Sequence, residues 1–406
     1  MRGICLYLHI HQPWRVRAYS IFDVGVNDNY FNDTNYSSKQ NNERIFKKVA
    51  EKSYLPTFDL LEKNLKQHKD FKFSLSITGV WLEQAELWMP ELISRLQKMV
   101  KTGRVELVAE TYYHSMAFFY DRDEFKDQVQ KQVEIFKKLF NVTPKVFRNT
   151  EFSYNDEIGR AVEELGFNAC LTEGWDKILG WRSPNFTYKA ANTQNLKLLL
   201  KNYRLSDDIA FRFSDKSWKD WPLTVDKYEQ WLNNACLDGN VINLFMDFET
   251  FGEHQWKETG IFDFMDHLID SWLAKFDNKF LTVSEEAALP PVGELSYPWT
   301  VTWADTERDL SAWMGNKLQD EAMTNLYALR PKILNVAKKY KSPQLLEDFR
   351  RLTTSDHAYY MCTKYWNDGD VHAYFSAYDS PYDAFMYFLN VLRSLEYKLD
   401  SYEESI

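Results

Sequence analysis

Short apolar runs alternate with longer amphipathic stretches over roughly the first two thirds of the chain. Each apolar run has the length of a β-strand and is followed at once by polar or aromatic residues. Seven such runs are present, at residues 3–11, 71–79, 104–109, 144–148, 169–172, 241–246 and 279–283. Their nearly continuous hydrophobicity is typical of parallel strands that are buried on both faces.

The stretches between these runs have helical spacing. Leu92, Leu96 and Val100 mark one apolar face, and Val129 and Val133 begin another. Strands that alternate with helices form a parallel sheet, and six or seven such units favour an α/β barrel. The pattern therefore predicts a barrel whose strands all point the same way.

The pattern changes near residue 288, after which a Pro-containing stretch at 289–293 reads as a connector. Beyond it, apolar residues recur at helical spacing in 310–318 and 326–336. Ser380, Pro381 and Asp383 have the types and spacing of a helix start. We predict two domains, a catalytic barrel over 1–288 and a mostly helical C-terminal region over 289–406 that packs on it.

Polar and aromatic side chains gather where the predicted strands end. In parallel barrels the carboxyl ends of the strands form one edge, which carries the chemistry. The residues expected at this edge are His9, His11, Trp81, Glu83, Glu110, His114, Glu151, Glu173 and Asp247.

Glu151 and Asp247 each follow an apolar strand directly. Two carboxyl groups across one pocket can cleave a glycosidic bond, one as nucleophile or base and the other as proton donor. Helix capping or an arginine partner at a strand end would explain either residue equally well. Spacing alone leaves both interpretations open.

His9 and His11 form a His-x-His pair on one face of the first strand. This spacing occurs in zinc sites, but it also suits hydrogen bonds to a sugar hydroxyl or a carboxylate, or a purely structural role. The acidic and aromatic run at 247–256 is either a site or an acidic helix start. A second acidic cluster, at 368–372, could be a calcium loop or a capping cluster, although it lacks EF-hand spacing.

Composition narrows the class of protein. The 406 residues carry 49 basic and 59 acidic side chains, a net charge of −10, which argues against a nucleic-acid partner. No apolar run is long enough to span a membrane, and the N-terminal run is too short for a signal peptide. Four isolated cysteines without metal-ligand spacing fit buried thiols in a reducing compartment, so we expect a cytoplasmic protein. The 16 % aromatic content can fill a core or provide platforms for sugar rings.

Several motifs together resemble glycoside hydrolase family 57, and in particular its short α-amylase-like members. They follow one another along nearly the whole chain, which makes the resemblance specific. In order, they lie at residues 11–13, 103–110, 149–151, 247–254, 282–284, 303–310, 354–357 and 379–383.

The resemblance implies an α/β fold with an incomplete (β/α)7 barrel and a helical C-terminal region. It also implies retaining chemistry on α-glucans, with Glu151 as nucleophile and Asp247 as general acid/base, about 5–5.5 Å apart. We predict substrate contacts for a further set of residues; for Trp181 and Trp303, packing in the core explains the sequence pattern as well as a sugar contact does. The set is His9, His11, Trp81, Glu110, His114, Trp181, His254, Trp303 and Asp356.

The predicted function is hydrolysis of α-1,4-glucosidic bonds in glycogen, starch fragments or maltodextrins. No cofactor or metal is required by this chemistry, and the oligomeric state is not predicted. Two features depart from the family pattern: Phe152-Ser153-Tyr154 replaces the Arg-Val-Trp typical of transferring and branching members, and Trp175 is bulky enough to alter a subsite. The alternatives are a 4-α-glucanotransferase with the same catalytic pair, a metal-dependent deacetylase or amidohydrolase, and a non-catalytic glucan-binding homologue.

Overall fold

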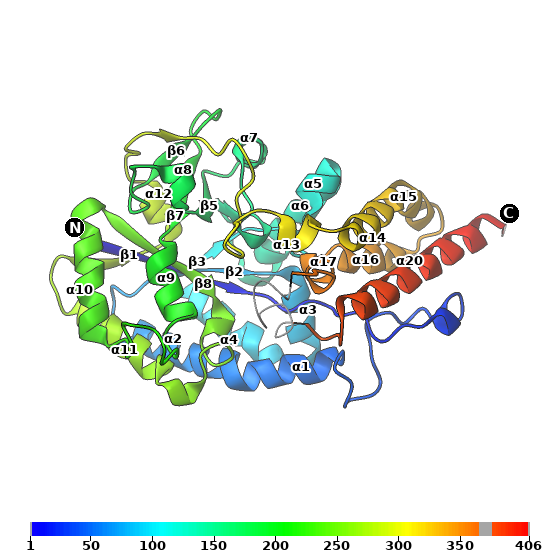
Figure 1. The fold of residues 1–406 in the computed structure, drawn as a ribbon, viewed down its shortest axis with the longest axis horizontal. Helices are drawn as coiled ribbons and strands as arrows, with labels where there is room; N and C mark the ends of the chain where they lie inside the picture. Colours follow the sequence, from blue (N-terminus) through cyan, green and yellow to red (C-terminus); the bar gives the residue numbers. More distant parts are fainter. Residues whose placement is uncertain (1, 365–375, 405–406) are drawn as a thin grey trace. The chain divides into compact units, whose positions relative to one another are not determined.

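A computed structural model of the protein describes residues 2–364 and 376–404 (Figure 1). The chain forms two compact units. The first comprises Met1–His11, Lys47–Glu110 and Val129–Trp303, and the second comprises Gln12–Phe46, Thr111–Gln128 and Ala304–Ile406. The predicted division at residue 288 stays a prediction. The acidic cluster at 368–372 lies outside the described residues.

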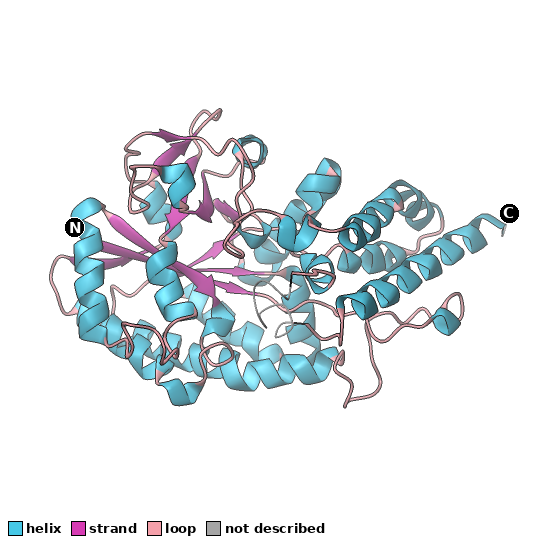
Figure 2. Ribbon diagram, viewed as in Figure 1, coloured by secondary structure: helices cyan, strands magenta, loops and turns pink. Residues whose placement is uncertain are grey.

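All ten strands of the described chain belong to the first unit (Figure 2). Each of the seven predicted runs overlaps one of these strands, and the structure adds β6, β7 and β10. In chain order they are β1 (Arg2–Ile10), β2 (Phe73–Ile77), β3 (Val105–Val108), β4 (Val146–Arg148), β5 (Ala169–Glu173), β6 (Tyr188–Ala190), β7 (Lys197–Lys201), β8 (Val241–Asp247), β9 (Asn278–Leu281) and β10 (Glu294–Leu295).

Seven parallel strands form the barrel, in two arcs. One arc has the order β3-β2-β1-β8, and the other contains β7-β5-β4. The arcs meet at a single bridge between Ala109 and Phe147, and at a hydrogen bond from the Asn202 N–H to the Asn243 carbonyl oxygen (3.0 Å). These joins are short, so the ring is incomplete, and the prediction of an incomplete (β/α)7 barrel is confirmed.

The structure changes one detail of that prediction. The seventh predicted run forms β9, which pairs only with the first residues of β1, Arg2 to Cys5. The strand that completes the ring is instead β7, which pairs with β5 in parallel and with the short β6 in antiparallel. β7 has a lysine at each end, Lys197 and Lys201, and only three leucines between them. This apolar run is too short to recognise from hydrophobicity alone.

Helices separate the strands, and local sequence explains where several begin. Thr78 accepts the Trp81 N–H and caps α3, while Thr282 and Glu285 form a capping box at α12. Both amphipathic stretches noted in the sequence are helical, as α4 and α6. The helices in this part of the chain are α1 (Asn42–Val49), α2 (Leu55–Gln67), α3 (Gly79–Trp88), α4 (Pro90–Lys101), α6 (Arg122–Phe140), α7 (Asp156–Glu164), α8 (Asp176–Leu179), α9 (Tyr203–Ala210), α10 (Val225–Ala235), α11 (Ile261–Leu273) and α12 (Val283–Ala287).

The described residues of the second unit form helices and loops and no strand (Figure 2). The helical spacing over 326–336 does not belong to one continuous helix. α14 stops at Ala328 and α15 starts at Arg330, with Pro331 in its first turn. Ser380 caps the last helix as its sequence predicts, accepting the Asp383 N–H at 3.1 Å. The helices are α5 (Ala117–Tyr120), α13 (Ser311–Met314), α14 (Lys317–Ala328), α15 (Arg330–Lys339), α16 (Pro343–Leu352), α17 (Ser355–Tyr360) and α20 (Pro381–Glu404).

Contacts between distant segments hold this second unit together. The fully buried Glu124 accepts hydrogen bonds from Arg330 and Arg350, both at 2.8 Å. The Tyr19 hydroxyl lies 3.0 Å from the Ser394 hydroxyl of α20. The unit is therefore assembled from three separate stretches of the chain.

The cysteines are free thiols, of which Cys5, Cys170 and Cys362 are buried and Cys236 is half-buried. Across residues 2–364 and 376–404, we find no helix with both the length and the apolar character needed to cross a bilayer.

Candidate active site

Strand alternation delivers a ring of polar side chains to one end of the barrel. The barrel core contains Tyr7, Leu171 and Phe245. Because side chains two apart share a face, the residue two positions beyond each core residue continues its row. Six rows end in this way on charged or titratable side chains, at His9, Glu110, Arg148, Glu173, Lys201 and Asp247.

His9 lies between two carboxyl groups. Its Nδ1 is 3.3 Å from Asp247 Oδ1, and its Nε2 is 3.2 Å from Glu110 Oε1. Arg148 Nη1 donates to Glu110 Oε2 at 3.4 Å. A carboxylate only accepts hydrogen bonds, so His9 satisfies both contacts when both ring nitrogens carry hydrogen. His9, Glu110 and Arg148 are buried, whereas the Asp247 side chain is about one third exposed.

The surroundings shift the pKa values of two carboxyl groups in opposite directions. Burial raises the pKa of Asp247, but the hydrogen bond and charge of His9, with smaller contributions from His254 and Arg148, outweigh it and hold the pKa below its ordinary value. Burial and the charge of Asp247 raise the pKa of Glu249 to about 8, although Tyr54 donates a 2.7 Å hydrogen bond to Glu249 Oε1. Asp247 is therefore ionised at neutral pH and Glu249 holds its proton.

Glu151 lies in a tight turn directly after β4. Its backbone is left-handed (φ 58°, ψ 27°), and Phe152 also has a positive φ of 52°. Such conformations cost free energy in residues other than glycine, so surrounding contacts must hold them. Trp303 supplies two: its N–H donates to the Glu151 carbonyl oxygen at 3.2 Å, and its indole Nε1–H donates to Glu151 Oε2 at 2.7 Å.

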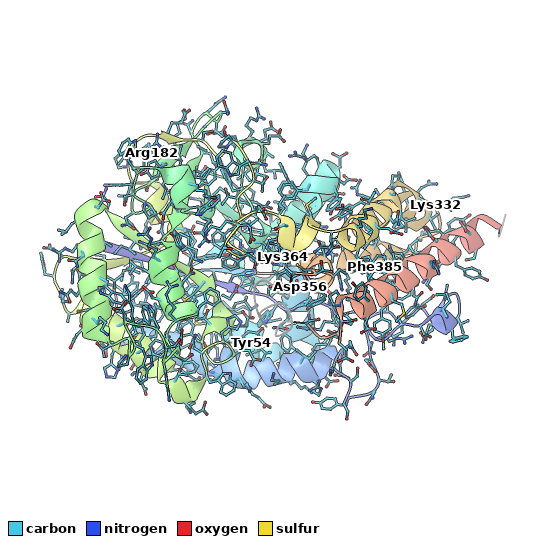
Figure 3. The ribbon with its side chains drawn as sticks, viewed as in Figure 1. Tyr54, Arg182, Lys332, Asp356, Lys364 and Phe385 are labelled. Atoms are coloured by element: carbon cyan, nitrogen blue, oxygen red, sulfur yellow. The ribbon has the colours of Figure 1, made fainter. Side chains whose placement is uncertain are left out.

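Three other predicted substrate contacts lie in the same unit. His11 stacks on His9 with ring centroids 5.9 Å apart, and its Nδ1 is 3.0 Å from Thr78 Oγ1. Burial lowers the pKa of His254, against opposing effects of Asp247 and Glu253. Trp81 is fully buried and packs edge-on against Tyr54, whose position Figure 3 marks.

The remaining predicted contacts lie elsewhere. In the second unit, the Ser355 N–H donates to the His114 carbonyl oxygen at 2.8 Å, which brings His114 beside the segment of Asp356 (labelled in Figure 3). Trp181 is 90 % exposed with the Arg182 guanidinium over its ring. Ser183, two residues on, bonds the Asp238 carbonyl oxygen, near the amino end of β8 and away from Asp247. A sugar contact for each of these residues stays a prediction.

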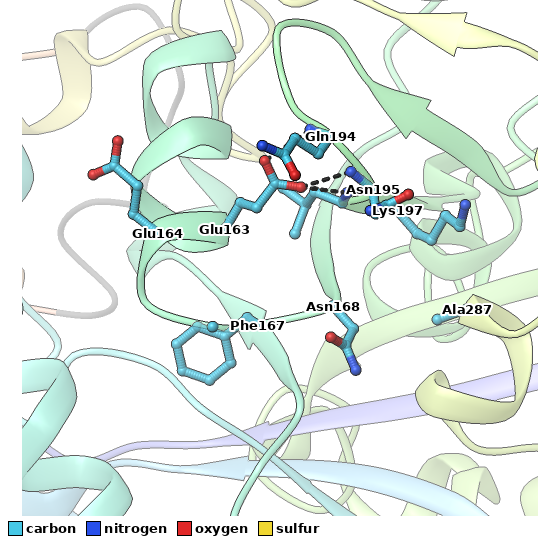
Figure 4. A pocket seen from close by; sticks show the side chains of 10 residues that line it. Glu163, Glu164, Phe167, Asn168, Gln194, Asn195, Lys197 and Ala287 are labelled. Atoms are coloured by element: carbon cyan, nitrogen blue, oxygen red, sulfur yellow. Dashed lines mark hydrogen bonds between the residues drawn. The ribbon is translucent and has the colours of Figure 1, made fainter.

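A cavity of about 580 Å³ opens at the opposite edge of the barrel (Figure 4). Asn168 and Lys197, at the amino ends of β5 and β7, line it together with Phe167. The Glu163 carboxylate beside it accepts the backbone N–H groups of residues 194–196 at 2.7–3.0 Å. The cavity is therefore separate from the edge that carries His9 and Asp247.

The His9–Glu110 pair offers atoms that can ligate a metal. Arg148 Nη1, however, lies 3.4 Å from Glu110 Oε2 and 3.5 Å from His9 Nε2. A guanidinium stays charged at every accessible pH, so a cation at this pair would meet a fixed positive charge. The donor set of this unit thus favours acid/base chemistry over metal binding.

Comparison with known proteins identifies the family. The model of Glycosyl hydrolase family 57 matches residues 5–298. A "Putative alpha-amylase" of Methanocaldococcus jannaschii is 43 % identical over 403 residues, which cover 97 % of this chain and 84 % of that protein. This chain belongs to glycosyl hydrolase family 57.

Solved structures of low sequence identity share its fold. The α-amylase AmyC of Thermotoga maritima superposes with a TM-score of 0.63 at 14 % identity, over 100 % of this chain and 96 % of that one. A 4-α-glucanotransferase of Thermococcus litoralis superposes with a TM-score of 0.63 at 16 % identity over 88 % of this chain, which spans only 56 % of that protein.

Sequence reasoning missed three groups at the active edge of this family 57 enzyme. Lys201 lies 3.8 Å from Glu173 and 3.0 Å from Asp207, and it also faces the Trp303 ring. Arg148 holds Glu110, and Tyr54 holds Glu249. For Arg148 a signal was available, because it is a cation at the last position of the otherwise apolar strand β4. For Lys201 there was none, because the strand β7 that it ends was not recognised.

Proposed function

We propose that this family 57 enzyme is a retaining α-glucan hydrolase of the α-amylase type that cleaves α-1,4-glucosidic bonds. The observation that carries the proposal is a pair of carboxyl groups, one in the turn after β4 and one at the last position of β8, each with an N–H partner. Glu151 is held by Trp303 and Asp247 by His9. The 43 % identity to the protein named "Putative alpha-amylase" supports the same substrate class.

In the proposed reaction, Glu151 attacks the anomeric carbon as the bond to the leaving oxygen breaks, and Asp247 gives that oxygen its proton. Asp247 then takes a proton from water, whose oxygen attacks the same carbon and releases Glu151. Because the pKa of Asp247 is held low in the free protein, this carboxyl must take up a proton before the first step. The second step uses the ionised form that the surroundings favour.

The proposal also includes the substrate contacts predicted from the sequence. Around the scissile bond we assign sugar contacts to His11, which stacks on His9, the partner of Asp247, and to His254, on whose pKa the charge of Asp247 acts. A 4-α-glucanotransferase remains the second candidate, because the fold is shared with one. Phe152 and Tyr154, both fully buried, stand where transferring members carry other side chains, which favours hydrolysis.

The test is a product time-course on maltoheptaose with wild type, Glu151→Gln, Asp247→Asn and the exposed control Glu258→Gln. Both active-site variants should lose about 10³-fold or more in kcat, and the control should not. NMR of the first products should show the α-anomer. A fully active Glu151→Gln variant, or a first product of β configuration, contradicts the proposal.

A parallel incubation with maltotriose separates the two candidates. Hydrolysis gives only shorter products, whereas accumulation of longer maltooligosaccharides identifies a glucanotransferase. Absence of turnover by wild type on both substrates, with maltodextrin binding retained, identifies a glucan-binding homologue instead.

A further inference from the structure

We propose that Trp303 is a positioning residue for the Glu151 carboxylate, and not only a surface on which sugar packs. This inference rests on the proposed function, in which Glu151 is the nucleophile. Trp303 holds Glu151 at both ends: the main-chain N–H reaches the carbonyl oxygen at 3.2 Å, and the indole N–H reaches Oε2 at 2.7 Å. One residue thus fixes both the backbone and the side chain of the nucleophile.

Glu151 needs such support because its turn is strained. Two successive residues, Glu151 and Phe152, have positive φ, a conformation that costs free energy in residues other than glycine. The turn is closed by the Phe152 N–H on the Asn149 carbonyl oxygen (3.0 Å). Just beyond it, Tyr154 and Val301 exchange two backbone hydrogen bonds of 2.9 Å, which bring the segment of Trp303 alongside.

The indole can serve as a fixed donor because its own position is fixed. The Arg148 guanidinium and the Lys201 ammonium each lie 5.2 Å from its ring centroid, within the range of cation–π attraction. The Phe152 ring packs against it with centroids 4.8 Å apart. Arg148 is itself tied to Glu110 and Lys201 to Asp207, so the ring rests on groups that are already held.

This arrangement makes a specific kinetic prediction. A carboxylate held by one strong N–H donor keeps a single orientation towards the anomeric carbon, which acts on the chemical step. Loss of that donor leaves the sugar contacts of the ring in place. The effect should therefore appear in kcat, whereas loss of a sugar platform would appear in KM.

The experiment compares wild type, Trp303→Phe and Trp303→His on maltoheptaose. Phenylalanine keeps an aromatic ring and the main-chain N–H but removes the indole donor. We expect kcat to fall by about 10- to 100-fold with KM within about threefold, the order of effect of one lost preorganised donor. Histidine retains a ring N–H and should recover part of the loss. Trp313→Phe, which changes a buried tryptophan of the second unit, should leave kcat unchanged.

A pH profile adds a readout that a merely structural role would not move. Since the indole N–H stabilises the ionised carboxylate, its removal should shift the acidic limb of kcat/KM upward by about 0.5–1 pH unit. Thermal unfolding of each variant shows whether the fold is kept. If Trp303→Phe does not fold, the same comparison is made between wild type and Trp303→His, where a partial fall in kcat with a smaller upward shift of the acidic limb supports the donor role. A rise in KM with kcat and the acidic limb unchanged overturns it.

The outcomes separate this inference from the proposed function. An unchanged kcat in folded Trp303→Phe, or a rise in KM alone, overturns the positioning role while wild-type activity and an inactive Glu151→Gln still support the nucleophile. A fully active Glu151→Gln overturns the proposed function, and the positioning role with it.

Discussion

His9 and Asp247 are directly paired neighbours in the parallel ladder of β1 and β8, and their side chains meet at 3.3 Å above it. The pairing makes the distance between the imidazole and the carboxyl group a property of strand register. A one-residue slip of either strand would turn one side chain out of the barrel.

The first prediction concerns this pair and the pH dependence of catalysis. His9 supplies the largest of the effects that lower the pKa of Asp247, so His9→Asn should raise it. Because the basic limb of kcat/KM follows loss of the acid's proton, it should move to higher pH in the variant. His11→Asn is the matched control, since His11 bonds Thr78, and its basic limb should not move. An unmoved limb in His9→Asn would contradict the assignment of Asp247 as the acid.

The second prediction concerns stability. Burial raises the pKa of Glu286 to about 8, in spite of hydrogen bonds with Asn243 and Cys5. The native state therefore keeps a proton that the unfolded chain releases near its ordinary value of about 4.3. This contribution is fully present below pH 4 and is lost as pH rises towards 8, with a maximum slope of about 1.4 kcal/mol per pH unit.

Glu286→Gln should remove that slope, so its urea midpoint should fall less than that of wild type between pH 5 and pH 8. Some slope should remain, because Glu249 has a raised pKa of the same sign. The exposed Glu258→Gln serves as the control and should follow wild type. Parallel pH profiles for Glu286→Gln and wild type would show that Glu286 does not carry the effect.

The third prediction compares two glycines of positive φ. A Cβ at Gly252 (φ 101°) would lie 1.9 Å from the Lys52 carbonyl oxygen, whereas one at Gly260 (φ 83°) would meet nothing within 4 Å. Gly252→Ala should cost about 3 kcal/mol or more and Gly260→Ala about 1 kcal/mol, measured as shifts in thermal unfolding. Equal shifts would mean that backbone strain alone, and not the contact with Lys52, sets the cost.

The fourth prediction concerns metal removal. Because Arg148 places a fixed charge beside the His9–Glu110 pair, dialysis against a chelator should leave the rate of maltoheptaose hydrolysis unchanged. Loss of activity that Zn²⁺ restores would instead support the metal-dependent alternative.

The sequence predicted the barrel well because buried parallel strands carry a strong local signal. All seven predicted runs overlap strands, and the helical character of the C-terminal region is confirmed. The strand β7 was missed because its lysine ends shorten the apolar run. The second unit combines three segments of the chain through distant contacts, such as that of Glu124 with Arg330. The hydrophobic periodicity within one segment does not reveal such contacts.

The candidate site likewise contains features that the sequence predicts and features that it does not. Strand ends placed Asp247, His9 and Glu110 at one edge, since alternation with period two follows from the backbone alone. The contact of Trp303 with Glu151 depends instead on the pairing of Tyr154 with Val301, which are 147 positions apart. Likewise, the raised pKa of Glu249 follows from burial, which the acidic run at 247–256 does not reveal.

The three-part composition of the second unit sets an order of events during synthesis on the ribosome. Residues 12–46 and 111–128 emerge long before 304–404, yet Glu124 must wait for Arg330 and Arg350, and Tyr19 for Ser394. The early segments leave the exit tunnel without their native partners. In a nascent chain paused before residue 330, Glu124 therefore lacks the two arginines that bind it in the native unit, and this unit can be completed only after α20 has been translated.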